Sequence, residues 1–91
     1  MSTMAILFIS FKPTFVRQLN KLESGLQNEV FEKISLLKDV NNHKLIAVHK
    51  LHGRLSDCHS FSVNFKYRIV FQYLSKSEIV LLAIGDHGVY R

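Results

Sequence analysis

The pattern of apolar and polar positions changes along this 91-residue chain. An apolar run and then apolar residues at helical spacing fill the first half, and alternating apolar and polar residues appear in the second half. Residues 4–11 are almost uniformly apolar and rich in β-compatible side chains, which predicts a largely buried first strand. Pro13 follows this strand and suits the first turn of a helix, because its missing N–H would have no intrahelical partner there. The next apolar positions recur at helical spacing and are Phe15, Leu19 and Leu22. We therefore expect a first helix that ends near residues 24–25.

A second helix is predicted directly after the first. Its apolar stripe consists of Leu26, Val30, Ile34 and Leu37. Residues 39–44 contain a turn-forming pair, Asn41 and Asn42, that closes this helix. The two helices together predict a helical hairpin.

The C-terminal half has the pattern of strands. Residues 59–65 alternate as in a half-exposed strand, with an apolar face formed by Phe61, Val63 and Phe65. Residues 68–74 and 78–84 are two further β-rich runs, joined by a polar turn, and predict an antiparallel meander. The expected fold class is α+β, in the order β-α-α-β-β-β, with an antiparallel sheet covered on one face by the helical hairpin.

The second sheet face is expected to stay uncovered and to present Ser62, Lys66 and Arg68 to a ligand. No repeat, low-complexity tract or linker divides the sequence, so residues 1–91 are expected to form a single domain. A hydrophobic fraction of 47% is enough to offset the conformational entropy that folding costs.

Charge narrows the choice of partner. The net charge of +5, with histidines neutral, favours an anionic partner such as nucleic acid or an acidic protein. The longest apolar run is too short to span a bilayer, and Cys58 is the only cysteine. We therefore expect a soluble, cytoplasmic protein without a disulfide, in which Cys58 is a buried bystander.

Residues 49–54 form the densest polar segment and contain His49, Lys50, His52 and Arg54. Such a cluster suits a phosphate group, and a solvated basic loop is the alternative interpretation. No third ligand with suitable geometry accompanies the two histidines, so a zinc site is not expected. We expect no metal and no cofactor.

A second polar segment ends the chain and contains His87 and Tyr90. The ordinary pKa of histidine, about 6.5, lets His87 give or take a proton near neutrality, although a structural histidine is the alternative. Together with Arg68 and the basic segment, these groups suit metal-free RNA cleavage. In that reaction a base takes the 2′-OH proton, cations stabilise the phosphate charge and an acid protonates the departing 5′-oxygen. A passive RNA clamp would use the same residues.

Four segments carry a family likeness: residues 15–22 (FVRQLNKL), 49–55 (HKLHGRL), 60–71 (SFSVNFKYRIVF) and 84–90 (IGDHGVY). In this order they resemble the RelE/ParE superfamily of bacterial toxin-antitoxin modules. The resemblance implies a toxin that cleaves mRNA, in most RelE-like members on the translating ribosome. It also implies a co-expressed antitoxin as partner, and an acidic antitoxin segment would complement the basic chain.

The resemblance and the chemistry together select the site. The expected catalytic residues are His87, Tyr90, His49 and Arg68, and the expected RNA- or phosphate-binding residues are Lys50, His52, Arg54 and Lys66. His59 either corresponds to a histidine of the YafQ-like branch or is structural, because it alternates with the apolar positions of its strand.

One position departs from the family pattern. Many RelE-like nucleases carry an arginine where this chain has Ser62, and serine cannot stabilise phosphorane charge as a guanidinium does. Either the histidines with Lys50 or Arg54 take over this work, or the nuclease is weak or lapsed. Two other functions stay open: a ParE-type toxin that inhibits DNA gyrase by binding it, and a module whose sole partner is the antitoxin.

Overall fold

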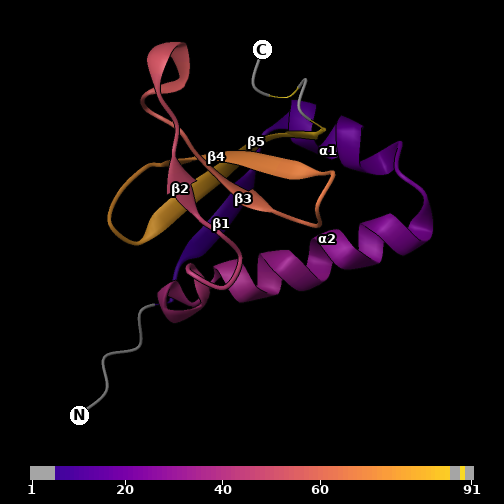
Figure 1. Cartoon of the computed structure of the whole chain (residues 1–91), viewed down its shortest axis with the longest axis horizontal. Helices are drawn as coiled ribbons and strands as arrows, with labels where there is room; N and C mark the ends of the chain where they lie inside the picture. The colour runs from indigo at the N-terminus through magenta and orange to yellow at the C-terminus, as the bar shows by residue number, and fades with distance from the viewer. Residues whose placement is uncertain (1–5, 87–88, 90–91) are drawn as a thin grey trace.

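The computed structural model describes residues 6–86 and residue 89. Its elements follow in the order β1 (Phe8–Phe11), α1 (Pro13–Asn20), α2 (Ser24–Leu37), η1 (Val40–Asn42), β2 (His49–Lys50), η2 (Gly53–Leu55), β3 (His59–Ser62), β4 (Arg68–Tyr73) and β5 (Glu78–Gly85). In Figure 1 the two long helices lie against the same sheet, α2 along one side and α1 near the end where β5 finishes. This arrangement confirms the predicted α+β class.

The helices begin close to where the apolar spacing placed them. α1 begins at Pro13, and the preceding Lys12 is extended, as expected for a proline in the first turn. The boundary between the helices differs from the prediction, because α1 ends at Asn20 while Ser24 and Gly25 open α2. A short link of residues 21–23 therefore reverses the chain.

The sheet is mixed, with the strand order β1-β5-β4-β3-β2. β1 runs parallel to β5, with Phe8 opposite Glu78, whereas the other neighbouring strands are antiparallel. The two helices lead from β1 to β2 at the opposite edge of the sheet, and β3 and β4 then lead back to β5, which pairs with β1. The short strand β2, which the sequence pattern did not reveal, forms the other edge of the sheet.

The prediction of a buried first strand was wrong. Phe8 is 72% exposed and Phe11 is 48% exposed, while Leu7, just before β1, is 3% exposed. Because β1 is an edge strand, one of its sides carries no neighbouring strand, and an apolar sequence alone does not bury it.

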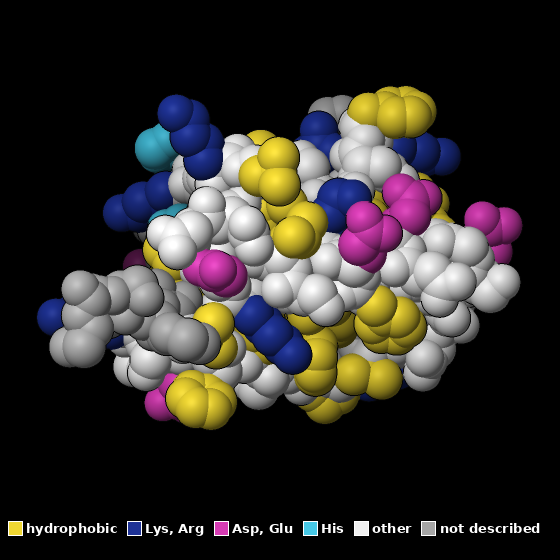
Figure 2. Space-filling model, turned by 90° about the horizontal axis from the view of Figure 1, so that it is seen from below, with side chains coloured by type: hydrophobic (Ala, Val, Ile, Leu, Met, Phe, Trp, Pro, Cys, Tyr) yellow, Lys and Arg dark blue, Asp and Glu magenta, His cyan; other side chains and the backbone are white. Residues whose placement is uncertain are grey.

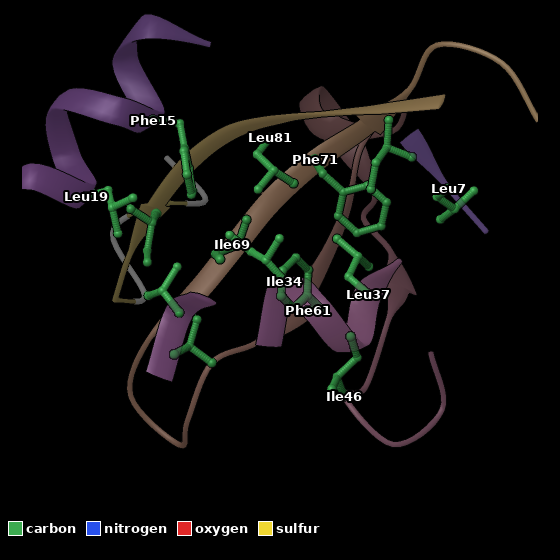
Figure 3. Packing of buried hydrophobic residues seen from close by; sticks show 14 residues of the cluster. Leu7, Phe15, Leu19, Ile34, Leu37, Ile46, Phe61, Ile69, Phe71 and Leu81 are labelled. Atoms are coloured by element: carbon green, nitrogen blue, oxygen red, sulfur yellow. The ribbon is translucent and has the colours of Figure 1, made fainter. Parts of the chain in front are cut away.

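The main core lies between the helices and the sheet. Figure 3 shows Phe15 and Leu19 of α1 and Ile34 and Leu37 of α2 converging on strand residues that include Phe61. Phe15, Leu37 and Phe61 have no exposed surface. The helical stripes and the apolar face of the meander thus meet as their spacing predicted.

A second, smaller cluster covers part of the other sheet face. Val70 points away from the helices, because its neighbours Ile69 and Phe71 belong to the main core. Leu51 and Cys58, from the segment between β2 and β3, pack on Val70. The expectation of an uncovered sheet face was therefore wrong over this area. No helix in the described part of the chain is long and apolar enough to cross a membrane.

Candidate functional site

His49 is the candidate residue whose side chain the structure orients most clearly. It begins β2, opposite Ser60 of β3. Its Nδ1 lies 3.0 Å from the carbonyl oxygen of Ala47, and its Nε2 lies 3.3 Å from the Ser60 hydroxyl oxygen. A carbonyl oxygen can only accept, so Nδ1 carries the proton in the neutral ring. The lone pair is then on Nε2 and accepts a hydrogen bond from Ser60.

The backbone conformation at Ala47 sets the orientation of the His49 ring. Ala47 has a positive φ of 57°, a conformation that is uncommon for residues other than glycine. The turn brings the backbone N–H of Val48 to the carbonyl of His43 at 2.9 Å and leaves the Ala47 carbonyl available to His49. Ser60 is completely buried while His49 is exposed. The hydrogen bonds of the two ring nitrogens therefore fix the orientation of the His49 imidazole, which stays accessible from solvent.

The basic segment does not form one patch around His49. Antiparallel partners share a sheet face, so Lys50 shares a face with His59, and His49 lies on the opposite face with Ser60. His52 and Arg54 are exposed at η2, beyond the end of β2. Strand alternation thus separates residues that are adjacent in the sequence.

His59 lies on the helix side of the sheet. Its ring stacks on Phe71 at 5.6 Å and meets Tyr73 edge-on at 5.0 Å. Burial lowers the pKa of His59, and positive charge on Lys50, His49 and His43 lowers it further. Its buried Nδ1 has no hydrogen-bond partner among the described residues. These surroundings favour the structural interpretation of His59.

Arg68 opens β4 between Ser62 of β3 and Gly85 of β5. Its Nη1 donates to the Asn64 carbonyl at 2.7 Å and lies 3.3 Å from the Tyr67 carbonyl. Part of the guanidinium therefore stabilises the turn between β3 and β4. Ser62 and Arg68 share a sheet face, so a cation does lie in the row where the family pattern has an arginine on β3.

His49 and Arg68 lie on one sheet face, with β3 between their strands. They are separated by two strand spacings and two residues along the strand, which corresponds to about 12 Å between their Cα atoms. η2 lies at the opposite end of β3 from Arg68, so His52 and Arg54 are further away. Lys66 is exposed near Arg68, with its Nζ 5.6 Å from the centre of the Tyr67 ring.

The described part of the C-terminal segment turns back at the end of β5. The Val89 N–H donates to the Asp86 carbonyl at 2.9 Å, and Val89 packs against the second apolar cluster. A Cβ added at Gly85 would lie 3.3 Å from the Cβ of Val89, so a glycine there permits the close return. His87 and Tyr90, two of the expected catalytic residues, lie outside the described residues.

Two supporting residues were not singled out in the sequence. Ser60 belongs to the polar face of an alternating strand, yet it is fully buried beside His49. Asn64 carries the turn through its side-chain oxygen, which accepts from the N–H groups of Lys66 and Tyr67. The type of residue at 64 is a turn signal, but nothing local in the sequence reveals the burial of Ser60.

The site is a surface rather than a pocket. Residues 6–86 and 89 enclose no detectable pocket, and among them no three metal-ligating side chains cluster.

Cys58 is buried, and this burial raises the pKa of its thiol. The negative charge of the nearby Asp57 raises the pKa further. Figure 2 shows Lys and Arg side chains beside histidines at the upper left of the face drawn, with acidic side chains below them and on the right.

Solved structures share this fold. YafQ from Escherichia coli strain BL21(DE3) aligns over 92% of this chain and 97% of its own, with a TM-score of 0.75 and 11% identity. The toxin-antitoxin complex RelBE2 from Mycobacterium tuberculosis aligns over 90% and 99%, with a TM-score of 0.72 and 20% identity. The RelE-RelB complex from Pyrococcus horikoshii OT3 aligns over 91% and 97%, with a TM-score of 0.71 and 17% identity. No family model matches the sequence, and no curated protein is significantly similar to it. The chain therefore has the fold of the RelE-like toxins.

Proposed function

We propose that this chain is the toxin of a type II toxin-antitoxin pair and that it cleaves mRNA without a metal ion. The observation that carries the proposal is the oriented imidazole of His49 on the same sheet face as Arg68. The shared fold of the RelE-like toxins and a net charge of +5 support it. The ribosome is the expected setting in which mRNA is presented to the chain.

The geometry suggests a division of labour. In the reaction Nε2 of His49 gives up the hydrogen bond that it accepts from Ser60 and takes the proton of the ribose 2′-OH, and the 2′-oxygen then attacks the phosphorus. Arg68 and Lys66 neutralise the charge that grows on the phosphate oxygens. His87 and Tyr90 remain the candidates, from the sequence, for the acid that protonates the departing 5′-oxygen. The bond from phosphorus to that oxygen breaks, which leaves a 2′,3′-cyclic phosphate and a 5′-hydroxyl.

A protein partner of complementary charge completes the proposal. The chain is basic, and its edge strand β1 exposes Phe8 and Phe11. An acidic antitoxin that also carries apolar side chains would suit such a surface. Two of the structures that share the fold are complexes of a toxin with its antitoxin. The predicted partners are thus an antitoxin, mRNA and the ribosome.

The test is primer extension on mRNA from cells that express the chain. His49→Ala is expected to reduce new 5′ ends by about 10²- to 10⁴-fold, because a general base is lost. His87→Ala is expected to abolish them. Lys44→Ala removes an exposed positive charge just before β2 and is expected to cut at the wild-type rate.

Two results would contradict the proposal. Full cleavage by His49→Ala would remove His49 from the reaction. Growth arrest without new 5′ ends, from the wild-type chain, would favour gyrase inhibition instead. Circular dichroism of each purified variant checks that it is folded.

A further inference from the structure

Phe65 is the most exposed large hydrophobic residue among those described, with 91% of its surface accessible. The alternating pattern placed it on the buried face with Phe61 and Val63, but β3 ends at Ser62 and the chain then turns. Single exposed hydrophobic residues are common on protein surfaces, so a role for Phe65 has to be argued from the turn that holds it and from the groups around it.

The turn that carries Phe65 is firmly built. The Asn64 side-chain oxygen accepts from the N–H groups of Lys66 at 2.9 Å and Tyr67 at 2.8 Å. The Asn64 carbonyl accepts from Arg68 at 2.7 Å, and the Val63 N–H donates to the Tyr67 carbonyl at 3.0 Å. The backbone on both sides of Phe65 is therefore fixed, and little conformational entropy would be lost when its ring meets a ligand.

Two cations and polar groups surround Phe65, and the Asn64 side-chain amide beside it donates to the Glu29 carboxylate at 3.5 Å. Lys66 follows it directly and is exposed, with its Nζ 5.6 Å from the Tyr67 ring. Arg68 lies at the base of the turn, in the row of Ser62 and Gly85. An exposed aromatic ring beside cations is how proteins hold single-stranded nucleic acid, with bases stacked on the ring and phosphates on the charges. A protein partner is less favoured, because the adjacent residues in the turn, Asn64 and Lys66, are polar.

We propose that Phe65 stacks on a nucleobase of single-stranded RNA while Lys66 contacts the neighbouring phosphate. The inference rests on the proposed function and deepens it, because it names the part of the chain that positions the RNA strand. Phe65 lies beyond Arg68 at the end of the sheet, and a strand held there would lead toward the Arg68 side of the site. Phe65 is thus a positioning residue and takes no part in proton transfer.

The experiment measures binding of a 2′-O-methylated RNA oligonucleotide, which cannot be cleaved, with 2-aminopurine as the fluorescent base. The fluorescence of 2-aminopurine falls when it stacks on an aromatic ring, so binding and stacking are read together. Phe65→Ala is expected to weaken binding by between about 5-fold and about 100-fold and to abolish the quenching. Phe65→Tyr should restore both. Phe31→Ala removes a 53% exposed phenylalanine from α2 and should change neither.

The outcomes separate the inference from the proposed function. Wild-type affinity and quenching in Phe65→Ala would overturn the stacking role, as would cleavage in cells by a wild-type chain that does not bind the oligonucleotide. Unchanged RNA binding with weakened binding of an acidic partner protein would overturn it too and assign Phe65 to that partner. Absence of mRNA cleavage by the wild-type chain in cells, tested separately, would remove the proposed function.

Discussion

His59 is a histidine whose environment disfavours its charged form. Burial comes first among the causes that lower its pKa, and Lys50, His49 and His43 add positive charge around it. The neutral ring lies against Phe71 and Tyr73. A proton on His59 would therefore cost the folded state more than the unfolded chain.

This difference predicts a loss of stability on acidification. As the pH falls below about 6.5, the unfolded chain binds a proton at residue 59 before the folded protein does, so the free energy of unfolding falls. His59→Phe keeps an aromatic ring that cannot be protonated and should flatten the change of the urea midpoint between about pH 7.5 and about pH 5. His52→Gln, at an exposed position, should leave that change as it is. An equal pH dependence in wild type and His59→Phe would contradict the account.

Single residues also show why the site was only partly predictable. The residue types at His49 and Arg68 suggested phosphate chemistry directly. The contact between His49 and Ser60 depends on the register of β2 against β3, and no local pattern encodes that register. Similarly, the hydrogen bond from Arg68 to the Asn64 carbonyl depends on the shape of the turn between β3 and β4.

At the scale of the elements, hydrogen bonds to the Asn64 side chain stabilise the turn between β3 and β4. The Asn64 side-chain oxygen accepts from two backbone N–H groups, and a net contribution of about 1 kcal/mol is typical of each such bond. Asn64→Ala is therefore expected to lower the free energy of unfolding by about 1–2 kcal/mol in urea denaturation. The Asn64 amide also lies 3.5 Å from the Glu29 carboxylate, so Asn64→Asp is compared in a Glu29→Gln background, where it keeps the acceptor oxygen and should lose less. Equal losses in the two variants would show that the acceptor oxygen is not what stabilises the turn.

The elements themselves were predicted to different degrees. α1 and α2 follow from apolar spacing, because a helix stripe and its core are local properties of the sequence. The exposure of β1 was missed, since strand order decides which strand lies at an edge. The cover over the second sheet face was missed because it depends on a long-range contact between residues 51–58 and Val70.

At the scale of the whole molecule, the net charge of +5 makes RNA binding depend on salt. Lys66→Ala is expected to weaken binding of the RNA oligonucleotide across base sequences and to reduce the slope of log affinity against log salt by about 1. Lys76→Ala removes the same charge from the turn between β4 and β5, at the other end of these strands, and should change the slope little. Equal effects of the two variants would mean that the field of the whole molecule, rather than a contact by Lys66, attracts the RNA.

The pairing of β1 with β5 has a consequence for folding during synthesis on the ribosome. The first strand of the chain lies beside the last, and β5 separates it from β4. During synthesis, β1 leaves the exit tunnel long before β5 exists, so it waits without its sheet partner while the helices form. Until β5 has emerged, the nascent chain lacks the strand that lies between β1 and β4, so the five-stranded sheet cannot close.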